Sequence, residues 1–428
     1  MSNTTEETMT TSQKSKLTLD EDWAVVVLGF IIIFLFLGGM IIPVPNYKWS
    51  SGQDFSENVL ASGNLLRMLY QFILVFVFSI IAALITGKPA KASLRVFPVL
   101  YMISVLALML EGNAWMNSIN LEAVIFSLSI GLLIGNLFTL PQWFRSVLNA
   151  ELFVKIGLVL LGTRIIFSEI LQAGSLGLVQ ALVVVLTVWY FAFWVCKKLK
   201  LDADLQMMIS TAVSICGVSA AIATAGAIKG DPKKLSYVIS LVLVTAIPMM
   251  IFMPYIAQFI GLSQEVTGAW IGGTIDTTGA VVAAGTLVGD IAVNISTIVK
   301  VSQNVLLGLA AFAISIYWTY TQRTPDGIEG DKPSLRLLWD RFPKFVLGFM
   351  AASMLFSFIL SPALVEATKG GLKSVQTLWF VLAFTCIGLE TRFSELFHAD
   401  NKRPLYAFLI AQSFNIIVTL IVAYFLFG

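Results

Sequence analysis

Two stretches of small and hydroxyl-bearing residues inside long apolar segments constrain this chain most. They read SICGVSAAIATAGAI at residues 214–228 and GGTIDTTGAVVAAG at residues 272–285. A helix that faces lipid is bulky and aliphatic, because hydrocarbon offers polar groups no partner. Segments rich in Gly, Ser and Thr are tolerated where helices pack closely or line a cavity. The pair therefore predicts either tight packing by small residues or two interrupted helices that build a transporter's binding site.

The overall composition places most of the chain in a lipid bilayer. Of its 428 residues, 57% are hydrophobic and 12% are charged, whereas soluble domains carry roughly 25% charged residues. A formal net charge of +2 is too small to indicate a nucleic-acid partner. The only histidine is His398, and Cys196, Cys216 and Cys386 have no zinc or disulfide spacing. We therefore expect no resident metal or organic cofactor, and a protein that is not an enzyme.

Apolar runs of about 20 residues, the length that crosses a bilayer, predict an all-α polytopic membrane protein. Thirteen such segments occur, at 24–43, 64–86, 96–110, 121–139, 152–171, 176–196, 206–228, 235–260, 268–288, 295–319, 342–361, 375–393 and 404–427. They predict a single transmembrane domain over residues 23–428. The polar residues 1–22 are expected to form a disordered cytoplasmic tail, and residues 321–344 a cytoplasmic loop between the two halves.

Basic loops predict the orientation of the chain in the membrane. Two lysines and an arginine at 88–95 follow the second segment, which places that loop and the N-terminus in the cytoplasm. The loop KGDPKK at 229–234 lies outside if segment 206–228 crosses fully. It stays inside if 206–228 and 268–288 are opposed re-entrant hairpins, which leaves eleven crossings. The alternative is two broken helices that both cross and one loop that breaks the rule.

The chain also contains an internal echo. GTRIIFSE at 162–169 is matched by GLETRFSE at 388–395, with Gly, Phe, Ser and Glu at identical spacing. The two copies lie in the fifth and twelfth segments, an odd number apart, so they face opposite ways. Inverted repeats are typical of secondary transporters, whose binding sites use discontinuous helices. The echo therefore favours an inverted-repeat secondary-transporter fold.

Four motifs occur in the order found in a known family. They are FVKIGLVLLGTRIIFSEIL, SICGVSAAIATAG, GAWIGGTIDTTGAVVAAG and FVLAFTCIGLETRFSEL. Through them the chain, from about Leu121 onward, resembles the YeiH-type family of bacterial inner-membrane proteins, which are named as sulfate exporters. The resemblance implies export of sulfate or another sulfur oxyanion, such as an organosulfonate, and a fold related to bile-acid-symporter-like and antiporter-like transporters. Asp276 and Thr277 stand where members often carry a His-Glu pair, and an extra pair of apolar segments precedes Leu121.

Candidate substrate-binding residues lie at the breaks and in the echo. Arg164 is costly in lipid unless it faces a cavity or a partner. We expect it either to grip an oxyanion through its planar fork or to pair with Glu390 or Glu169. A helix beginning near Ser219 would attract an anion through its free amides. The complete candidate set is Arg164, Ser214, Cys216, Gly217, Ser219, Thr274 and Asn304.

Candidates for binding a coupling ion centre on Asp276. Its carboxylate, the hydroxyls of Thr277 and Thr278 and freed main-chain oxygens suit Na⁺, whereas a protonatable carboxyl group alone would serve H⁺. Asp276 is otherwise a helix cap that follows a Gly-Gly turn. Glu390 is either the partner of an arginine or a proton carrier. Lys300 either lines the cavity or neutralises Asp276.

Together these features predict a secondary active transporter of a small anion, coupled to Na⁺ or H⁺, with its substrate held between the two broken segments. A transporter of organic carboxylates and a channel are the alternatives. A channel needs a continuous hydrophilic pore, and the polar residues here are clustered. The expected partners are the anionic substrate and the lipid bilayer, and a homodimer is compatible with the sequence.

Overall fold

A computed structural model of the chain describes residues 19–40, 42–118, 123–164, 167–228, 230–321, 339, 342–391 and 402–428. Every regular element in these ranges is a helix, and an isolated bridge joins Trp49 to Asn113. Within the described residues, eight helices are long and apolar enough to cross a membrane by length and composition. The predicted all-α polytopic fold is therefore confirmed. The expected tail at 1–22 and loop at 321–344 lie mostly outside the described residues.

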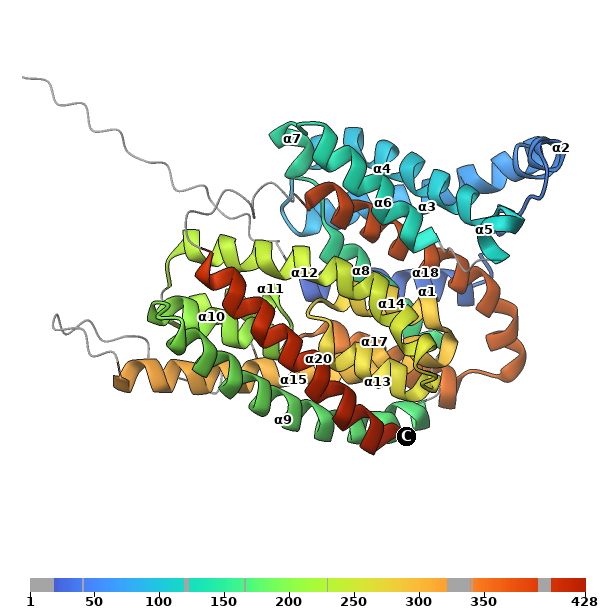
Figure 1. Cartoon of the computed structure of the whole chain (residues 1–428). Helices are drawn as coiled ribbons and strands as arrows, with labels where there is room; N and C mark the ends of the chain where they lie inside the picture. The colour runs from blue at the N-terminus through green and yellow to red at the C-terminus, as the bar shows by residue number, and fades with distance from the viewer. Residues whose placement is uncertain are drawn as a thin grey trace, which may run out of the picture.

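The long helices lie side by side and run roughly from left to right in Figure 1. The elements are α1 (Glu21–Leu37), α2 (Gly52–Asp54), η1 (Phe55–Val59), α3 (Ser62–Ile85), α4 (Ala90–Glu111), α5 (Ala114–Ser118), α6 (Ala123–Leu137), α7 (Gln142–Arg145), α8 (Ala150–Leu161), η2 (Gly162–Arg164), α9 (Phe167–Lys198), α10 (Ala203–Ser214), α11 (Val218–Ile228), α12 (Pro232–Phe259), α13 (Gln264–Thr274), α14 (Thr278–Val288), α15 (Asp290–Thr321), α17 (Phe345–Met354), η3 (Leu355–Ile359), α18 (Pro362–Glu390) and α20 (Arg403–Phe427).

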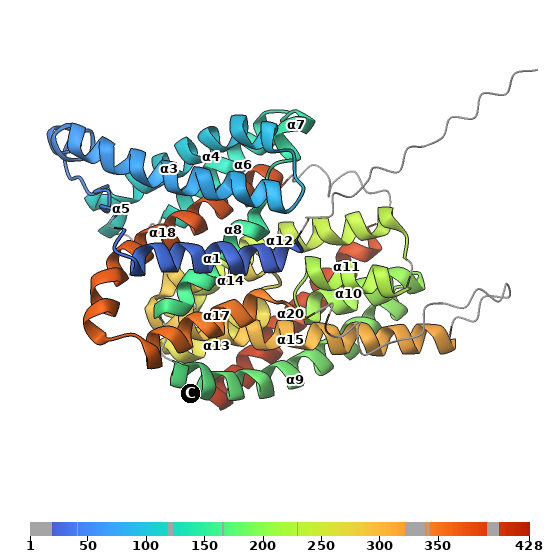
Figure 2. The same cartoon turned by 180° about the vertical axis from the view of Figure 1, so that it is seen from behind.

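Besides the eight membrane-length helices, three shorter elements, α1, α6 and α17 continued by η3, lie roughly parallel to them in Figure 1. Figure 2 shows that α1 begins at the end of the molecule opposite to the C-terminus.

The first small-residue stretch folds as a helical hairpin of α10 and α11. Asp202 caps α10, its side chain accepting a hydrogen bond from Leu205 N. Lys234, in the first turn of α12, places its Nζ 2.8 Å from Asp202 Oδ1. The chain therefore enters and leaves this hairpin at the same end, and residues 230–234 lie beside the start of α10. This arrangement favours the re-entrant hairpin over a full crossing.

The second stretch folds as a hairpin of α13 and α14. Gly289, just after α14, lies so close to the start of α13 that an added Cβ would be 2.6 Å from Gln264 Oε1. α12 runs the length of the molecule between the two hairpins, so they enter from opposite ends. Their tips meet, because a Cβ added at Gly217 would lie 3.0 Å from Asp276 Cβ.

Each hairpin turns at a residue suited to the break. Gly217 has φ +58°, a left-handed conformation that glycine adopts without the steric penalty of a Cβ. Two residues earlier, Ile215 ends α10 with φ −120° and ψ −86°. In the second hairpin Thr277 is extended and caps α14, its hydroxyl accepting from Ala280 N. Asp276 is therefore not the helix cap, and that alternative for its role is wrong.

The helices form two bundles. The first bundle contains α1, α3, α4, α6, α8, α17 and α18, with α18 packed along α6 and α8. The hairpin bundle contains α9 to α15 and α20, with both hairpins packed on α15 and α20. The bundles contact each other through α14, which packs on α8 and α18, and through α9 and α17. The hairpin that ends in α14 thus bridges the two bundles.

Gly162 and Gly388, the first matched residues of the internal echo, both lie at close helix crossings. A Cβ added at Gly162 would lie 2.4 Å from Phe349 O in α17. One added at Gly388 would lie 2.5 Å from Leu128 O in α6. Both glycines therefore let backbones approach. The matched Phe, Ser and Glu of the second copy lie outside the described residues, and the inverted repeat stays a prediction.

Candidate functional site

A cavity of about 620 Å³ lies between the two bundles. The first bundle contributes the starts of α1, α8 and α17 and the end of α18, and the hairpin bundle contributes α11, α12, α14 and α15. Six of the residues singled out in the sequence line it. They are Cys216, Ser219, Thr277, Thr278, Asn304 and Glu390.

The inner end of the cavity is formed by the N-termini of two half-helices. α11 begins at Val218 and α14 at Thr278, and both residues line the cavity. The first N–H groups of a helix have no partner within it, and they carry a partial positive charge. Asn304, on α15, donates from Nδ2 to Thr278 Oγ1 at 3.3 Å and thereby orients that hydroxyl. Hydroxyl, amide and thiol groups thus surround two electropositive helix ends.

The opposite, carbonyl ends of the hairpin helices are capped by side chains. Lys300 Nζ donates to Ile215 O at 2.8 Å, at the end of α10. Gln303 Nε2 donates to Ser214 O at 2.8 Å and to Gly273 O at 3.3 Å, so one amide joins both hairpins. Asn415, on α20, makes the same kind of bridge. Its Nδ2 donates to Val213 O at 3.1 Å and to Thr274 O at 3.2 Å.

Asp276 lies where the tips of the two hairpins meet, a place that we call the hairpin crossing, and it is 1% exposed. It does not line the cavity, and it has no ion pair among the described residues. Lys300 is near enough to act on it electrostatically, which agrees with the expectation that Lys300 neutralises Asp276, although its ammonium hydrogen bonds go to Ile215 O and Gln303 Oε1. Thr277 and Thr278 line the cavity, and their role in binding a coupling ion with Asp276 stays a prediction.

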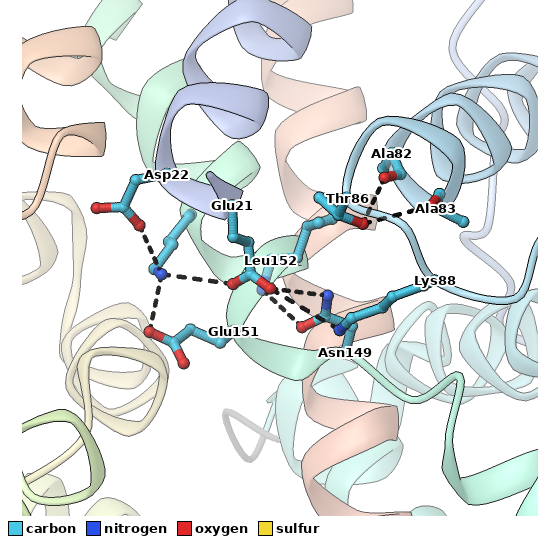
Figure 3. Close-up of polar contacts among 10 residues, drawn as sticks. Glu21, Asp22, Ala82, Ala83, Thr86, Lys88, Asn149, Glu151 and Leu152 are labelled. Atoms are coloured by element: carbon cyan, nitrogen blue, oxygen red, sulfur yellow. Dashed lines mark hydrogen bonds and ion pairs between the residues drawn. The ribbon is translucent and has the colours of Figure 1, made fainter. Parts of the chain in front are cut away.

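The outer part of the cavity is charged, and Lys155 is its centre. The Lys155 ammonium lies 2.7 Å from Asp22 Oδ1, 2.8 Å from Glu151 Oε1 and 3.5 Å from Glu21 Oε1. Figure 3 shows these three carboxylates converging from α1 and α8. Glu21 also lies 3.8 Å from Lys88 Nζ. One ammonium thus holds the first turn of α1 against α8 at the edge of the cavity.

Arg164 is far from the cavity. It ends η2 after α8, whereas Glu151 and Lys155, at the start of α8, border the cavity together with Glu390. Its Nη2 lies 3.1 Å from Asp290 Oδ1. The predicted proximity of Arg164 and Glu390 is therefore wrong. Arg164 lies beyond the end of α8, whereas Glu390, the last residue of α18, lies near the start of α8.

The remaining candidates lie behind the cavity wall. Ser214, Gly217 and Thr274 are buried at the crossing, where their main-chain groups or close contacts hold the two tips together. Two polar residues of α20, Gln412 and Asn415, and the cavity residue Lys155 were not among the residues predicted from the sequence. Each is a polar side chain within an apolar run, a signal that predicts an interior position in a membrane protein.

Comparison with known proteins places the chain in a family. The family model described as conserved hypothetical protein 698 matches residues 96–407. The UPF0324 membrane protein RB9488 of Rhodopirellula baltica is 41% identical over 367 residues, which cover 82% of this chain and 67% of that protein. A UPF0324 membrane protein of Nitratidesulfovibrio vulgaris is 41% identical over 317 residues, covering 71% of this chain and 54% of its own length.

The chain thus spans between about half and two thirds of the length of these relatives. No solved structure matches it. The resemblance noted in the sequence is confirmed at the level of the family. The chain belongs to the conserved hypothetical protein 698 family of membrane proteins, which is the YeiH-type family that its motifs resemble.

Proposed function

We propose that the protein is a secondary active transporter of a small anion, which binds where the two hairpin tips meet. One observation carries the proposal: α11 and α14 present their N-termini to the cavity, while Lys300, Gln303 and Asn415 cap the carbonyl ends of α10 and α13. Because the negative ends are capped and the positive ends are open, the inner end of the cavity favours an anion.

The position of the cavity supports transport by alternating access. Its walls come from both bundles, so a shift of the hairpin bundle against the first bundle would close one entrance and open another. The cavity extends from the hairpin tips to the charged residues at the start of α1 and α8. In this arrangement a substrate would reach the cavity from the end of the molecule where α1 begins.

The lining also bears on the substrate class. The walls between the hairpin tips and the charged edge are largely aliphatic, with Ile222, Leu243, Ile247, Met250 and Leu307. Apolar side chains contact a carbon skeleton better than they contact a hydrated inorganic ion. The family resemblance implies sulfate or another sulfur oxyanion, and of these an organosulfonate fits the cavity better than bare sulfate. An organic carboxylate is the alternative substrate.

Transport by the purified protein in proteoliposomes tests the proposal. We expect saturable movement of at least one anion from a panel of sulfate, a short alkanesulfonate and the carboxylate of equal chain length, with Na⁺ and pH gradients imposed separately. Uptake and efflux are both measured, because the family resemblance implies export. No anion flux above that of empty liposomes, from protein that stays folded, would refute the proposal.

The same liposomes distinguish a carrier from a channel or an enzyme. A carrier loaded with unlabelled substrate accelerates entry of labelled substrate, because loaded sites return faster than empty ones. A channel shows no such exchange, and an enzyme changes the chemical identity of the labelled anion. We expect exchange with the anion recovered intact.

We further propose that this multi-pass protein lies in the bacterial inner membrane with the start of α1 on the cytoplasmic side. The basic loop at 230–234 lies at the end of the molecule where α10 begins. Basic loops are typically cytoplasmic, so we assign this end to the cytoplasm. A cysteine placed at Asp231, in a background without the native cysteines, should resist an impermeant maleimide added to intact cells and react in inside-out vesicles. Labelling from outside would overturn the orientation.

A further inference from the structure

Three buried oxygen atoms beside the hairpin crossing lack hydrogen-bond partners among the described residues. They are Asp276 Oδ2, Thr274 Oγ1 and Gln412 Oε1. Their side chains are 1%, 1% and 3% exposed. Buried polar atoms are almost always paired, since leaving one unpaired costs its full desolvation. Unpaired oxygens on three neighbouring side chains are the pattern expected at a ligand-binding site.

These three side chains belong to a single small region. Gln412, on α20, donates from Nε2 to Thr274 O at 3.0 Å, and its side chain is near enough to Asp276 to act on it electrostatically. Thr274 ends α13, two residues before Asp276. Because the bond to Thr274 O fixes the orientation of the amide, Oε1 of Gln412 is the atom left without a partner. The region is the carbonyl end of a half-helix, opposite in polarity to the cavity.

A ligand suited to these atoms carries positive charge. All three unpaired atoms are oxygens, and two of them, the carboxylate and the amide oxygen, can only accept. Lys300 does not supply the charge directly, because its ammonium donates to Ile215 O and Gln303 Oε1 and makes no ion pair with Asp276. Asn304 Oδ1 is also unpaired, but Asn304 belongs to the cavity wall and its amide donates to Thr278 Oγ1, so we assign it to the anion site.

We propose that Asp276, Thr274 and Gln412 bind a sodium ion at a site separate from the anion cavity. Carboxylate, hydroxyl and amide oxygens are the hard ligands that such a cation takes. The site holds one carboxylate, and the described residues contain no cluster of three His, Cys, Asp or Glu side chains suited to a metal ion. A single negative charge matches a monovalent rather than a divalent cation. The carbonyl end of a broken helix is a common location for transported Na⁺.

The charges at the crossing imply that Na⁺ and the anion assist each other's binding. Lys300 and Asp276 in their charged forms sum to zero, so Na⁺ alone or the anion alone leaves a net buried charge. Both ions together restore neutrality, and a buried uncompensated charge is costly. Each ion should therefore raise the affinity for the other by the same factor. This coupling rests on the proposed anion transport, whereas the sodium site itself does not.

Sodium binding to the full-length purified protein tests the site without any substrate. We measure binding of radiolabelled Na⁺ and thermal unfolding in NaCl, KCl and choline chloride at equal ionic strength and pH. We expect Na⁺ to bind saturably and to raise the unfolding temperature more than K⁺ or choline does. Asp276→Asn should weaken Na⁺ binding at least tenfold. Thr274→Val keeps the shape, removes one oxygen, and should weaken binding several-fold.

Asp54→Asn is the matched control, because it makes the same chemical change at a partly exposed carboxylate at the end of α2, whose hydrogen bonds are to its near neighbours. Its Na⁺ affinity should equal that of the unchanged protein. Unchanged Na⁺ affinity in both Asp276→Asn and Thr274→Val would overturn the site. So would the absence of any cation effect, which would mean that water binds the three oxygens. Stabilisation by low pH alone would also overturn it, because Asp276 would then bind a proton instead of Na⁺. If Na⁺ binds as expected but its affinity does not change when a transported anion is added, the sodium site is supported and the proposed coupling is refuted.

Discussion

Arg164 Nη2 lies 3.1 Å from Asp290 Oδ1, and this ion pair joins the first bundle to the hairpin bundle. Arg164 follows α8 and Asp290 begins α15. The pair lies at the end of α8 remote from Lys155 and the cavity. It therefore joins the two bundles on the side remote from the cavity, and we expect it to separate when the bundles move apart on this side.

Breaking the pair should favour the opposite conformation. Arg164 is 17% and Asp290 73% exposed, and ion pairs this accessible contribute about 0–1 kcal/mol, which corresponds to a population shift of at most about fivefold. Native Cys216 lines the cavity and can report the shift once Cys196 and Cys386 are replaced by Ala. In Arg164→Ala or Asp290→Ala, we expect impermeant thiol reagents to label Cys216 faster from outside and more slowly from inside.

The charge-swapped double variant, Arg164→Asp with Asp290→Arg, provides the control for this prediction. It should return both labelling rates toward those of the unchanged protein. Equal rates in all four proteins would show that the pair has no part in closing this side.

Removing the hydroxyl of Thr278 should weaken anion binding. Thr278 begins α14, lines the cavity and accepts from Asn304 Nδ2. A hydrogen bond to a charged group contributes about 1.5–3 kcal/mol, so Thr278→Val should raise the KM for the anion about tenfold or more. Thr286→Val is the matched control, because Thr286 lies on the same helix outside the cavity and donates to Val282 O. Equal effects of the two variants would argue against binding at this helix end.

Adding a single methyl group at Gly217 should disturb the hairpin crossing. Alanine would be strained at φ +58°, at a cost of about 1–2 kcal/mol, and its Cβ would lie 2.5 Å from Val242 Cγ1. Gly217→Ala should therefore lower the unfolding temperature and reduce transport, and Val242→Ala in the same chain should recover part of both. Gly370→Ala, where nothing lies within 4 Å of the added atom, should change neither.

Replacing Lys155 should loosen α1. Lys155→Met leaves Glu21, Asp22 and Glu151 close together without their shared cation, and we expect a loss of about 2 kcal/mol, below the roughly 3–5 kcal/mol of fully buried pairs. Thermal unfolding and protease cleavage near the start of α1 measure the effect. Lys369→Met removes an exposed lysine 3.8 Å from Glu366 and should cost about 0–1 kcal/mol. Similar losses in both variants would contradict a special role for Lys155.

The interruptions of the two segments could be predicted from the sequence because their causes are local. Small residues at 214–228 and 272–285 mark segments that lipid does not tolerate, whereas the lysines at 229–234 left open whether the first segment turns back or crosses. Breaks in such segments expose helix ends. Residues chosen at the breaks, such as Ser219 and Thr278, accordingly line the cavity.

The partners of buried polar groups could not be predicted in this way. The cost of a charge in lipid shows that Arg164 needs a partner, but Asp290 lies 126 residues further along the chain, and only packing brings the two together. Gln412 and Asn415 are isolated amides in an apolar run, and their role depends on carbonyl groups freed in two distant hairpins. Long-range geometry decides these contacts, and no local pattern encodes it.

Because the cavity has one wall from each bundle, affinity and access are controlled by different residues. If the hairpin bundle carries the anion, Ser219 and Thr278 travel with it, while Lys155 and Glu390 stay behind with the first bundle. Changes to the travelling wall should then alter dissociation constants equally on both faces of the membrane. Changes to the stationary wall should alter entry and exit rates on one face alone, so the protein can become kinetically asymmetric without losing its selectivity.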